Sequence, residues 1–316
     1  MSKERIIFMG TPEFAAYALE ELIANNYNIV AVITAVDKPA GRGRKINESA
    51  VKKVGLKHHI PILQPPNLKN ERFLKALESF NASIQIVVAF RMLPEVVWSM
   101  PSKGTFNLHA SLLPEYRGAA PINWAIINGE TKTGVTTFFI DEKIDTGEII
   151  LNEEVDITED ETAGSLHDKL MIIGGQLIQS TIDLIVQNKI KTQPQPQNNV
   201  SLKKAPKLFK ENCRINWNDN VLKVKQMIHG LSPYPGAWTE LLVGDKTLSL
   251  KIFKVMAQHE SHSEVFGSIK SDKKEIRVYA SDGFLSVLEL QLQGKRKMNT
   301  IDFLNGFSFS EDTKVL

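Results

Sequence analysis

The chain has 316 residues, of which 42% are hydrophobic and 23% are charged, a composition typical of soluble globular proteins and not of disordered chains. Its single cysteine, Cys213, excludes a disulfide framework and any metal cluster built on cysteines. The N-terminus lacks a signal peptide's apolar core, and we find no apolar stretch near the roughly 20 residues that cross a bilayer. We therefore expect a cytoplasmic protein without a membrane partner.

The first half of the chain alternates between strand-like and helix-like segments, in which apolar spacing sets the type. Strands are predicted at residues 5–9, 29–34, 84–90, 104–110, 135–140 and 148–155, and helices at 12–24, 50–57, 69–79 and 162–186. The segment 84–90 is nearly all β-branched, as expected for a strand buried on both faces. Such alternation indicates an α/β domain around a mostly parallel sheet.

The sequence changes character after this half. Alternating Gln and Pro at 193–197 can continue neither a helix nor a central strand, so we predict a linker over residues 188–207. This leaves domains at 1–187 and 208–316. The second domain has one predicted helix, 221–228, followed by short strands at 237–243, 247–255, 268–269, 275–280 and 284–292. Closely spaced strands with turn signals predict a small β-barrel.

Charge is distributed unevenly between the two halves. Residues 201–316 contain 18 Lys and Arg against 13 Asp and Glu, while the rest of the chain contains 20 against 23. A basic second half suggests a polyanionic partner. A surplus of five positive charges is also common in small domains, where it only aids solubility.

Two polar residues occupy the end of a predicted strand. Asn107 and His109 are two positions apart, so both side chains point to the same face. In open α/β sheets, ligands bind at the carboxyl ends of strands. An amide that donates to an oxyanion, beside an imidazole that moves protons, suits acyl transfer. The alternative is an asparagine that caps a turn beside a histidine with only structural contacts.

Asp145 lies in a turn, Ile144-Asp145-Thr146-Gly147, between two predicted strands. Aspartate before Thr-Gly is common turn chemistry. Its functional interpretation requires the carboxylate to lie near His109, where it would orient the ring and raise its basicity.

Two loops have the composition of a wall for a flat heteroaromatic ring. The first is Ser111-Leu112-Leu113-Pro114, directly after the Asn/His strand, and the second is Phe90-Arg91-Met92, at the end of the buried strand. A third loop, residues 37–48, carries Lys38, Arg42, Arg44 and Lys45, spaced by Gly41 and Gly43, and suits phosphate contacts. A solvated surface loop explains that third composition equally well.

Several of these segments together resemble the folate-dependent formyltransferases. The resemblance rests on residues 8–15 (FMGTPEFA), 88–94 (VAFRMLP), 107–114 (NLHASLLP) with 116–118 (YRG), and 144–147 (IDTG), in that order. It extends over nearly the whole chain. Residues 39–45 (PAGRGRK) and 230–238 (GLSPYPGAW) favour the branch of the family that acts on tRNA. Ile84-Gln85 and Lys143 depart from the residues that are frequent there.

The resemblance implies a Rossmann-like first domain, an OB-like second domain and a site for each substrate. It implies 10-formyltetrahydrofolate as formyl donor, the α-amine of methionyl initiator tRNA as acceptor, no metal, and a monomer. The implied catalytic residues are Asn107, His109 and Asp145. The implied folate-binding residues are Ser111, Leu112, Leu113, Pro114, Phe90, Arg91 and Met92, and the tRNA-binding residues are Arg42, Arg44, Lys45, Lys295, Arg296 and Lys297.

Two other functions remain open at this point. An RNA-binding module would need only the basic barrel, but it would not need the Asn107, His109 and Asp145 set. A formylfolate hydrolase or a sugar formyltransferase would share that set without depending on tRNA.

Overall fold

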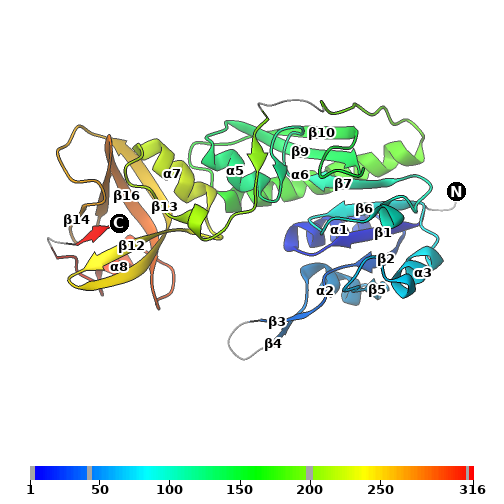
Figure 1. Ribbon diagram of the computed structural model, residues 1–316, viewed down its shortest axis with the longest axis horizontal. Coiled ribbons are helices and arrows are strands. Elements are labelled where there is room, and N and C mark those ends of the chain that lie inside the picture. Colours follow the sequence, from blue (N-terminus) through cyan, green and yellow to red (C-terminus); the bar gives the residue numbers. More distant parts are fainter. Residues whose placement is uncertain (1–3, 41–44, 197–201, 311–312) are drawn as a thin grey trace. The chain divides into compact units, whose positions relative to one another are not determined.

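The fold is that of a computed structural model, which describes residues 4–40, 45–196, 202–310 and 313–316 (Figure 1). The chain forms two compact units. Unit 1 comprises Met1–Gly118, Thr133–Asp156 and His167–Lys204, and unit 2 comprises Ala119–Lys132, Ile157–Leu166 and Ala205–Leu316. The chain therefore passes between the units several times. The linker and boundaries expected from the sequence stay a prediction.

A seven-stranded sheet forms the centre of unit 1. Its order is β10-β9-β7-β6-β1-β2-β5, with β1–β2, β1–β6, β2–β5 and β6–β7 parallel and β7–β9 antiparallel. The strands are β1 (Ile6–Gly10), β2 (Ile29–Ile33), β5 (Ile62–Leu63), β6 (Ile84–Val88), β7 (Thr105–His109), β9 (Lys132–Phe139) and β10 (Ile149–Asp156). All five residues of β1 and of β6 are buried, as predicted for strands with helices on both faces. The mostly parallel, Rossmann-like sheet confirms the predicted fold class.

Helices cover both faces of this sheet. On one face, α3 (Glu71–Ser79) and α4 (Glu95–Trp98) contribute Phe73, Leu77 and Val97 to a core that includes alternate residues of β1. On the other face lie α1 (Glu13–Ala24) and α2 (Ala50–Lys57), which contact each other. The β1–α1 turn is tight, because a Cβ on Gly10 would lie 2.5 Å from the Ala15 Cβ and 2.9 Å from the Val88 carbonyl oxygen.

Helix α6 (Ala163–Val186) packs on the strands that carry the candidate site. A Cβ on Gly174 would lie 2.7 Å from the Leu108 side chain, and the hydroxyls of Thr137 and Thr181 are hydrogen-bonded (2.8 Å). By length and composition alone, α6 is apolar enough to cross a membrane, so the expectation that no stretch has this character was wrong. Its buried apolar stripe and its packing on the sheet are those of a core helix.

The segment expected as a basic loop begins and ends in a short antiparallel ribbon, which corrects that expectation. Strands β3 (Lys38–Ala40) and β4 (Lys45–Asn47) pair with each other and project beyond β2 and β5 (Figure 1). The ribbon is anchored at its base, where Asp37 accepts from Gln64 (2.8 Å) and pairs with Lys52. The Lys52 ammonium holds the pKa of Asp37 below its usual value.

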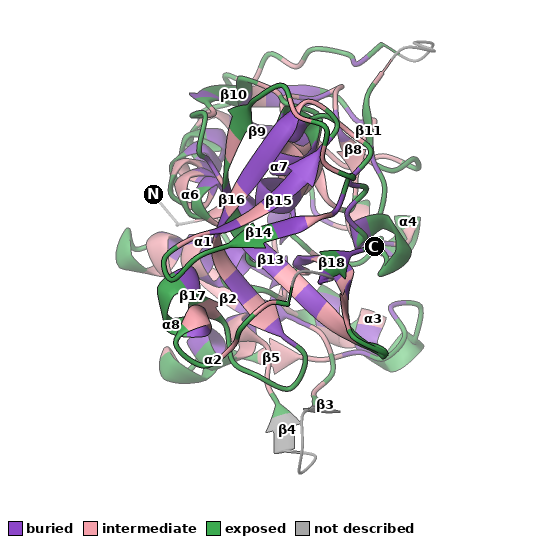
Figure 2. Cartoon of the chain, turned by 90° about the vertical axis from the view of Figure 1, so that its left-hand side faces the viewer, coloured by how far each residue is buried: buried purple, intermediate pink, exposed green. Residues whose placement is uncertain are grey.

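Unit 2 is built on an antiparallel, nearly closed sheet of order β14-β15-β16-β13-β12-β18, with β17 paired to β16. Its strands are β12 (Ala237–Val243), β13 (Lys246–His259), β14 (Ile269–Ser271), β15 (Ile276–Ala280), β16 (Gly283–Leu292), β17 (Met298–Asn299) and β18 (Lys314–Val315). Buried and partly exposed residues alternate along most of β12, whereas β15 and β16 are largely buried (Figure 2). The barrel confirms the predicted second fold.

Helices complete the core of unit 2. Helix α7 (Val221–Gly230) packs on β13 and on α5 (Pro121–Ile127), while α8 (Thr300–Leu304) packs on β16. The chain also contains two-residue strands β8 (Arg117–Gly118) and β11 (Lys204–Ala205) and a 3-10 turn, Glu211–Cys213. The short elements α4, α5, α8, β17 and β18 had not been predicted. An element of only a few residues is too short to show a periodic pattern of apolar residues.

Candidate active site

Strand β7 carries Asn107 and His109 at its carboxyl end. Its backbone is held on both sides: Asn107 pairs with Val87 of β6 and with Phe138 of β9. His109 is buried and Asn107 is half-buried. No described residue is hydrogen-bonded to the Asn107 side-chain amide, which leaves its N–H groups available to a ligand.

The His109 ring is oriented by a backbone carbonyl. Its Nε2 lies 2.9 Å from the Tyr116 carbonyl oxygen, and because a carbonyl can only accept, Nε2 carries the hydrogen. In its neutral form the ring therefore presents a lone pair at Nδ1. That atom faces Asp145, with 3.9 Å between Nδ1 and the carboxylate Oδ2. This separation is too long for a direct hydrogen bond, so a proton donor of a substrate can lie between the two atoms.

Asp145 is held at the tip of a strained turn between β9 and β10. Its φ of +56° is in the left-handed region, which costs free energy for a residue other than glycine. The carboxylate Oδ2 accepts from the Gly118 backbone N–H (3.0 Å). On the backbone side of the turn, the Gln195 amide donates to the carbonyls of Asp145 (3.2 Å) and Gly147 (2.7 Å).

Hydrogen bonds to Thr136 and within the segment hold the loop after β7. The Thr136 hydroxyl donates to the Ser111 carbonyl (2.6 Å) and accepts from the Leu113 N–H (3.2 Å). The Ser111 hydroxyl donates to the Glu115 carbonyl (2.7 Å), and Leu113-Pro114 is a cis peptide. Leu113 packs in a small apolar cluster with Phe138 and Ile149.

The second predicted folate segment follows β6. The Arg91 guanidinium lies 5.6 Å from the centre of the Phe90 ring and donates to the carbonyls of Pro65 and Pro66. Arg91 is therefore occupied by contacts within the protein. The Met92 side chain is exposed.

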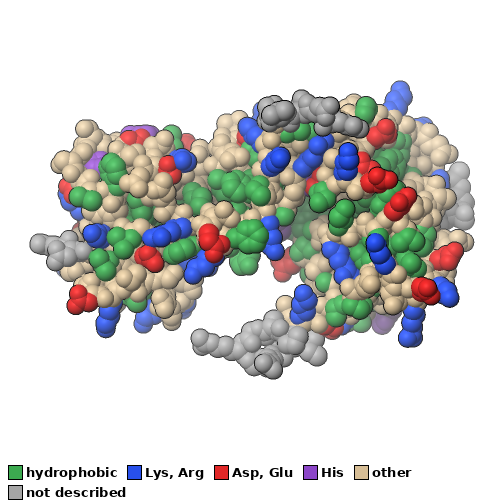
Figure 3. All heavy atoms as spheres, in the orientation of Figure 1, with side chains coloured by type: hydrophobic (Ala, Val, Ile, Leu, Met, Phe, Trp, Pro, Cys, Tyr) green, Lys and Arg blue, Asp and Glu red, His purple; other side chains and the backbone are tan. Residues whose placement is uncertain are grey.

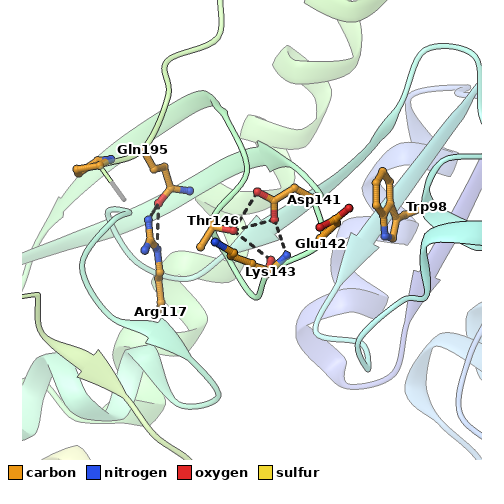
Figure 4. A pocket seen from close by; sticks show the side chains of 8 residues that line it. Trp98, Arg117, Asp141, Glu142, Lys143, Thr146 and Gln195 are labelled. Carbon is orange, nitrogen blue, oxygen red and sulfur yellow. Dashed lines mark hydrogen bonds between the residues drawn. The ribbon is translucent and has the colours of Figure 1, made fainter. Parts of the chain in front are cut away.

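A cavity of about 410 Å³ opens beside the Asp145 turn (Figure 4). The Gln195 and Arg117 side chains meet on one side of it, and Asp141, bonded to the Thr146 hydroxyl (2.7 Å), lies between these and Trp98. Its lining residues are Trp98, Arg117, Asp141, Glu142, Lys143, Thr146, Gln195 and Pro196. This volume suits a small organic ligand.

Comparison with known proteins identifies the family. Residues 4–182 match the formyl transferase family, and residues 207–308 match the C-terminal domain of formyl transferases. The chain is 56% identical to the methionyl-tRNA formyltransferase of Flavobacterium johnsoniae and 52% identical to that of Bacteroides thetaiotaomicron, with 100% of this chain and of each relative covered. The chain belongs to the methionyl-tRNA formyltransferase family.

More distant members of this fold have been solved with folates. The sugar 3N-formyl transferase WlaRD, crystallised with dTDP and 5-N-formyl-THF, has a TM-score of 0.65 at 20% identity and covers 94% of this chain and 100% of its own. HypX of Aquifex aeolicus in complex with tetrahydrofolic acid has a TM-score of 0.66 at 17% identity and covers 96% of this chain and 47% of its own. At these identities the likeness shows the fold.

The structure bears on the predicted site residues and adds others that the family motifs do not mark. The fold brings His109 and Asp145 together, as expected, and fixes the 111–114 loop beside them. Arg117 and Thr146 lie inside family motifs, where a half-buried cation and a turn hydroxyl could have been noticed. Trp98, Asp141 and Gln195 lie outside those motifs, and no sequence signal marks them as neighbours of the cavity.

The structure describes the side chains of only some of the predicted tRNA-binding residues. Arg42 and Arg44 lie outside those residues, and Lys45 is known only as backbone of β4. Lys295, Arg296 and Lys297 are exposed after β16, where Lys297 pairs with Glu289 (2.6 Å). On the face shown in Figure 3, the Lys and Arg side chains are interspersed with acidic ones.

Proposed function

We propose that this chain transfers the formyl group of 10-formyltetrahydrofolate to the α-amine of methionyl initiator tRNA, with Asn107, His109 and Asp145 at the reacting centre. The observation that carries the proposal is the approach of His109 Nδ1 to the Asp145 carboxylate, at 3.9 Å, beside the free amide of Asn107. This combines two proton acceptors and an oxyanion donor, the groups that acyl transfer to an amine requires.

His109 and Asp145 prepare the amine. An aminoacyl ester's α-ammonium must lose a proton before its nitrogen can attack. Because His109 Nε2 donates to the Tyr116 carbonyl, its Nδ1 accepts, and Asp145 offers a second acceptor 3.9 Å away. A substrate N–H held between these atoms can pass its proton to either one. This geometry differs from a hydrolase triad, in which the carboxylate accepts directly from the imidazole.

Asn107 stabilises the intermediate. When the neutral amine adds to the formyl carbon, the C=O electron pair moves onto oxygen, and the Asn107 N–H donates to that oxyanion. The intermediate collapses as the bond from carbon to folate N10 breaks. N10 takes one proton, supplied by protonated His109, and the second amine proton leaves to solvent. The products are the formylated aminoacyl ester and tetrahydrofolate.

The donor binds along the two predicted loops and in the cavity beside the Asp145 turn. One wall for the donor is the loop after β7, which Thr136 holds by two hydrogen bonds and which contains Ser111, Leu112, Leu113 and Pro114. The segment after the neighbouring strand β6 carries Phe90, Arg91 and Met92. The cavity beside the Asp145 turn, with the flat Trp98 ring and the polar Asp141 and Thr146, has room for a heterobicyclic ring. Its closeness to Asp145 would bring the donor's formyl group to the reacting centre.

The acceptor tRNA binds through phosphate contacts. We assign these to Arg42, Arg44 and Lys45 of the segment 37–48 and to Lys295, Arg296 and Lys297 of the barrel, because cations suit a polyanion. Of these residues, Lys295, Arg296 and Lys297 are exposed. We further propose that the enzyme acts as a monomer in the cytoplasm, where initiator tRNA is charged.

The test is formyl transfer from 10-formyltetrahydrofolate to three acceptors in parallel: methionyl initiator tRNA, glycinamide ribonucleotide and water. We expect product with the tRNA alone. Transfer only to the small amine, or release of formate without formylated tRNA, would reject the proposed substrate while leaving a formyl-transfer centre. The Asn107→Ala variant serves as the catalytic control, since it removes the oxyanion donor.

A further inference from the structure

We infer that Gln195, in the segment expected to be a linker, is a positioning residue for Asp145 during formyl transfer. The inference rests on the proposed function, because it assigns Gln195 a role only through Asp145. It adds a residue 50 positions away in the chain to the catalytic centre.

Every polar atom of the Gln195 amide is used. The nitrogen donates to the carbonyls of Asp145 (3.2 Å) and Gly147 (2.7 Å), on either side of Thr146. The oxygen accepts from Nε (3.2 Å) and Nη2 (2.6 Å) of Arg117 (Figure 4). The residue is buried, with 7% of its surface exposed, so these bonds are little weakened by competing water.

These contacts close a ring around the catalytic carboxylate. Arg117 holds the Gln195 amide, the amide holds the backbone of the Asp145 turn, and the Asp145 carboxylate accepts from Gly118, the residue next to Arg117. The two-residue strand β8 is therefore hydrogen-bonded to the turn in two ways: Gly118 donates to the Asp145 carboxylate, and Arg117 binds Gln195, which binds the turn backbone. The φ of +56° at Asp145 needs such support, because an isolated turn would relax from it.

The backbone of Gln195 is itself fixed by its neighbours. Two residues earlier, Gln193 exchanges both backbone hydrogen bonds with Ile149 of β10, each 2.9 Å long. Pro194 and Pro196 flank Gln195 and restrict the backbone on both sides. The amide is thus presented to the turn at a set place, which suits positioning better than it suits a flexible connection.

The chemistry selects glutamine at this position. A glutamate would keep an acceptor for Arg117 but would set an oxygen against the carbonyls of Asp145 and Gly147. An asparagine is shorter by one methylene and cannot reach both partners. Gln195→Glu therefore removes the grip on the turn while keeping the contact with Arg117, and Gln195→Ala removes both.

The experiment is a double-mutant cycle on formyl transfer to methionyl initiator tRNA, using wild type, Gln195→Ala, Asp145→Ala and the double variant. We expect Gln195→Ala to lower kcat about 10- to 100-fold, because a shift of the order of 1 Å in a catalytic group has that effect. KM for the tRNA should stay unchanged. In the Asp145→Ala background, the same substitution should lower kcat no further, since the residue acts through Asp145.

Controls separate positioning from stability. Gln193→Ala, whose exposed side chain lies in the same segment, should keep the wild-type kcat. If Gln195→Ala does not fold, Gln195→Glu is measured in its place and should show the same loss of kcat.

An equal loss of kcat in both backgrounds, or a normal kcat in the single variant, would overturn the inference alone. A wild-type chain that formylates no tRNA would overturn the proposed function, and the inference with it.

Discussion

Replacing Gly147 by alanine should damage catalysis through a collision that the structure defines. An ideal Cβ at this position would lie 1.7 Å from the Phe139 carbonyl oxygen, which is 1.3 Å short of the 3.0 Å below which real Cβ atoms are essentially never found. The colliding atom is the backbone carbonyl oxygen of Phe139, the last residue of β9, and unlike a side chain it cannot rotate away. The Asp145 turn must therefore move by at least this difference.

Such a movement carries the carboxylate away from its place 3.9 Å from His109 Nδ1. A displacement of this size predicts a loss in kcat of the order of 10²-fold. Forcing a methyl group into a packed site also costs about 1–3 kcal/mol of the free energy of unfolding. The turn's bonds from Gln195 to the Asp145 and Gly147 carbonyls would lengthen together.

Two measurements check this expectation: steady-state formylation of methionyl initiator tRNA, and thermal unfolding of the purified variant. Gly306→Ala is the matched control, since a Cβ there meets nothing within 4 Å. A Gly147→Ala variant with wild-type kcat and wild-type unfolding temperature would refute the reasoning. A variant that is destabilised yet fully active would show that the turn can move without harm to the chemistry.

Three further predictions follow from other residues. Asn107→Ala should lower kcat about 10²–10³-fold without changing the unfolding temperature, and an unchanged kcat in the tRNA assay would exclude the oxyanion role. Burial lowers the pKa of His229, so below about pH 6.5 the unfolded chain binds a proton that the folded chain does not. The free energy of unfolding should therefore decrease as the pH is lowered below about 6.5, by up to about 1.4 kcal/mol per pH unit. Denaturant unfolding across that pH range measures this dependence. His229→Gln should flatten the dependence, whereas replacing the exposed His259 by glutamine should not. Lys295→Ala should reduce the slope of log affinity for tRNA against log salt by about 1 if its exposed ammonium contacts a phosphate; an unchanged slope would remove Lys295 from the interface.

Local patterns in the residues predicted the long helices and strands and the type of chemistry. Period-two spacing predicts Asn107 and His109 on one face of a strand, and β7 carries both at its carboxyl end. The apolar stripe of the long helix and the β-branched run of β6 are equally local, because burial on one or both faces leaves a direct pattern in the residues. The likeness to formyltransferase motifs then identified the family, which the comparisons confirmed.

The arrangement of those residues around one another depends on contacts between distant parts of the chain. Nothing in the local pattern indicates that the Tyr116 carbonyl, and not Asp145, takes the His109 hydrogen, since that depends on the path of the loop after β7. Nor does the sequence place Gln195 against Arg117, which lies 78 residues away. A Gln and Pro segment has the composition of a linker, yet the fold uses one buried amide of it to hold the catalytic turn. Contacts between distant residues are set by packing, and packing leaves no period in the sequence.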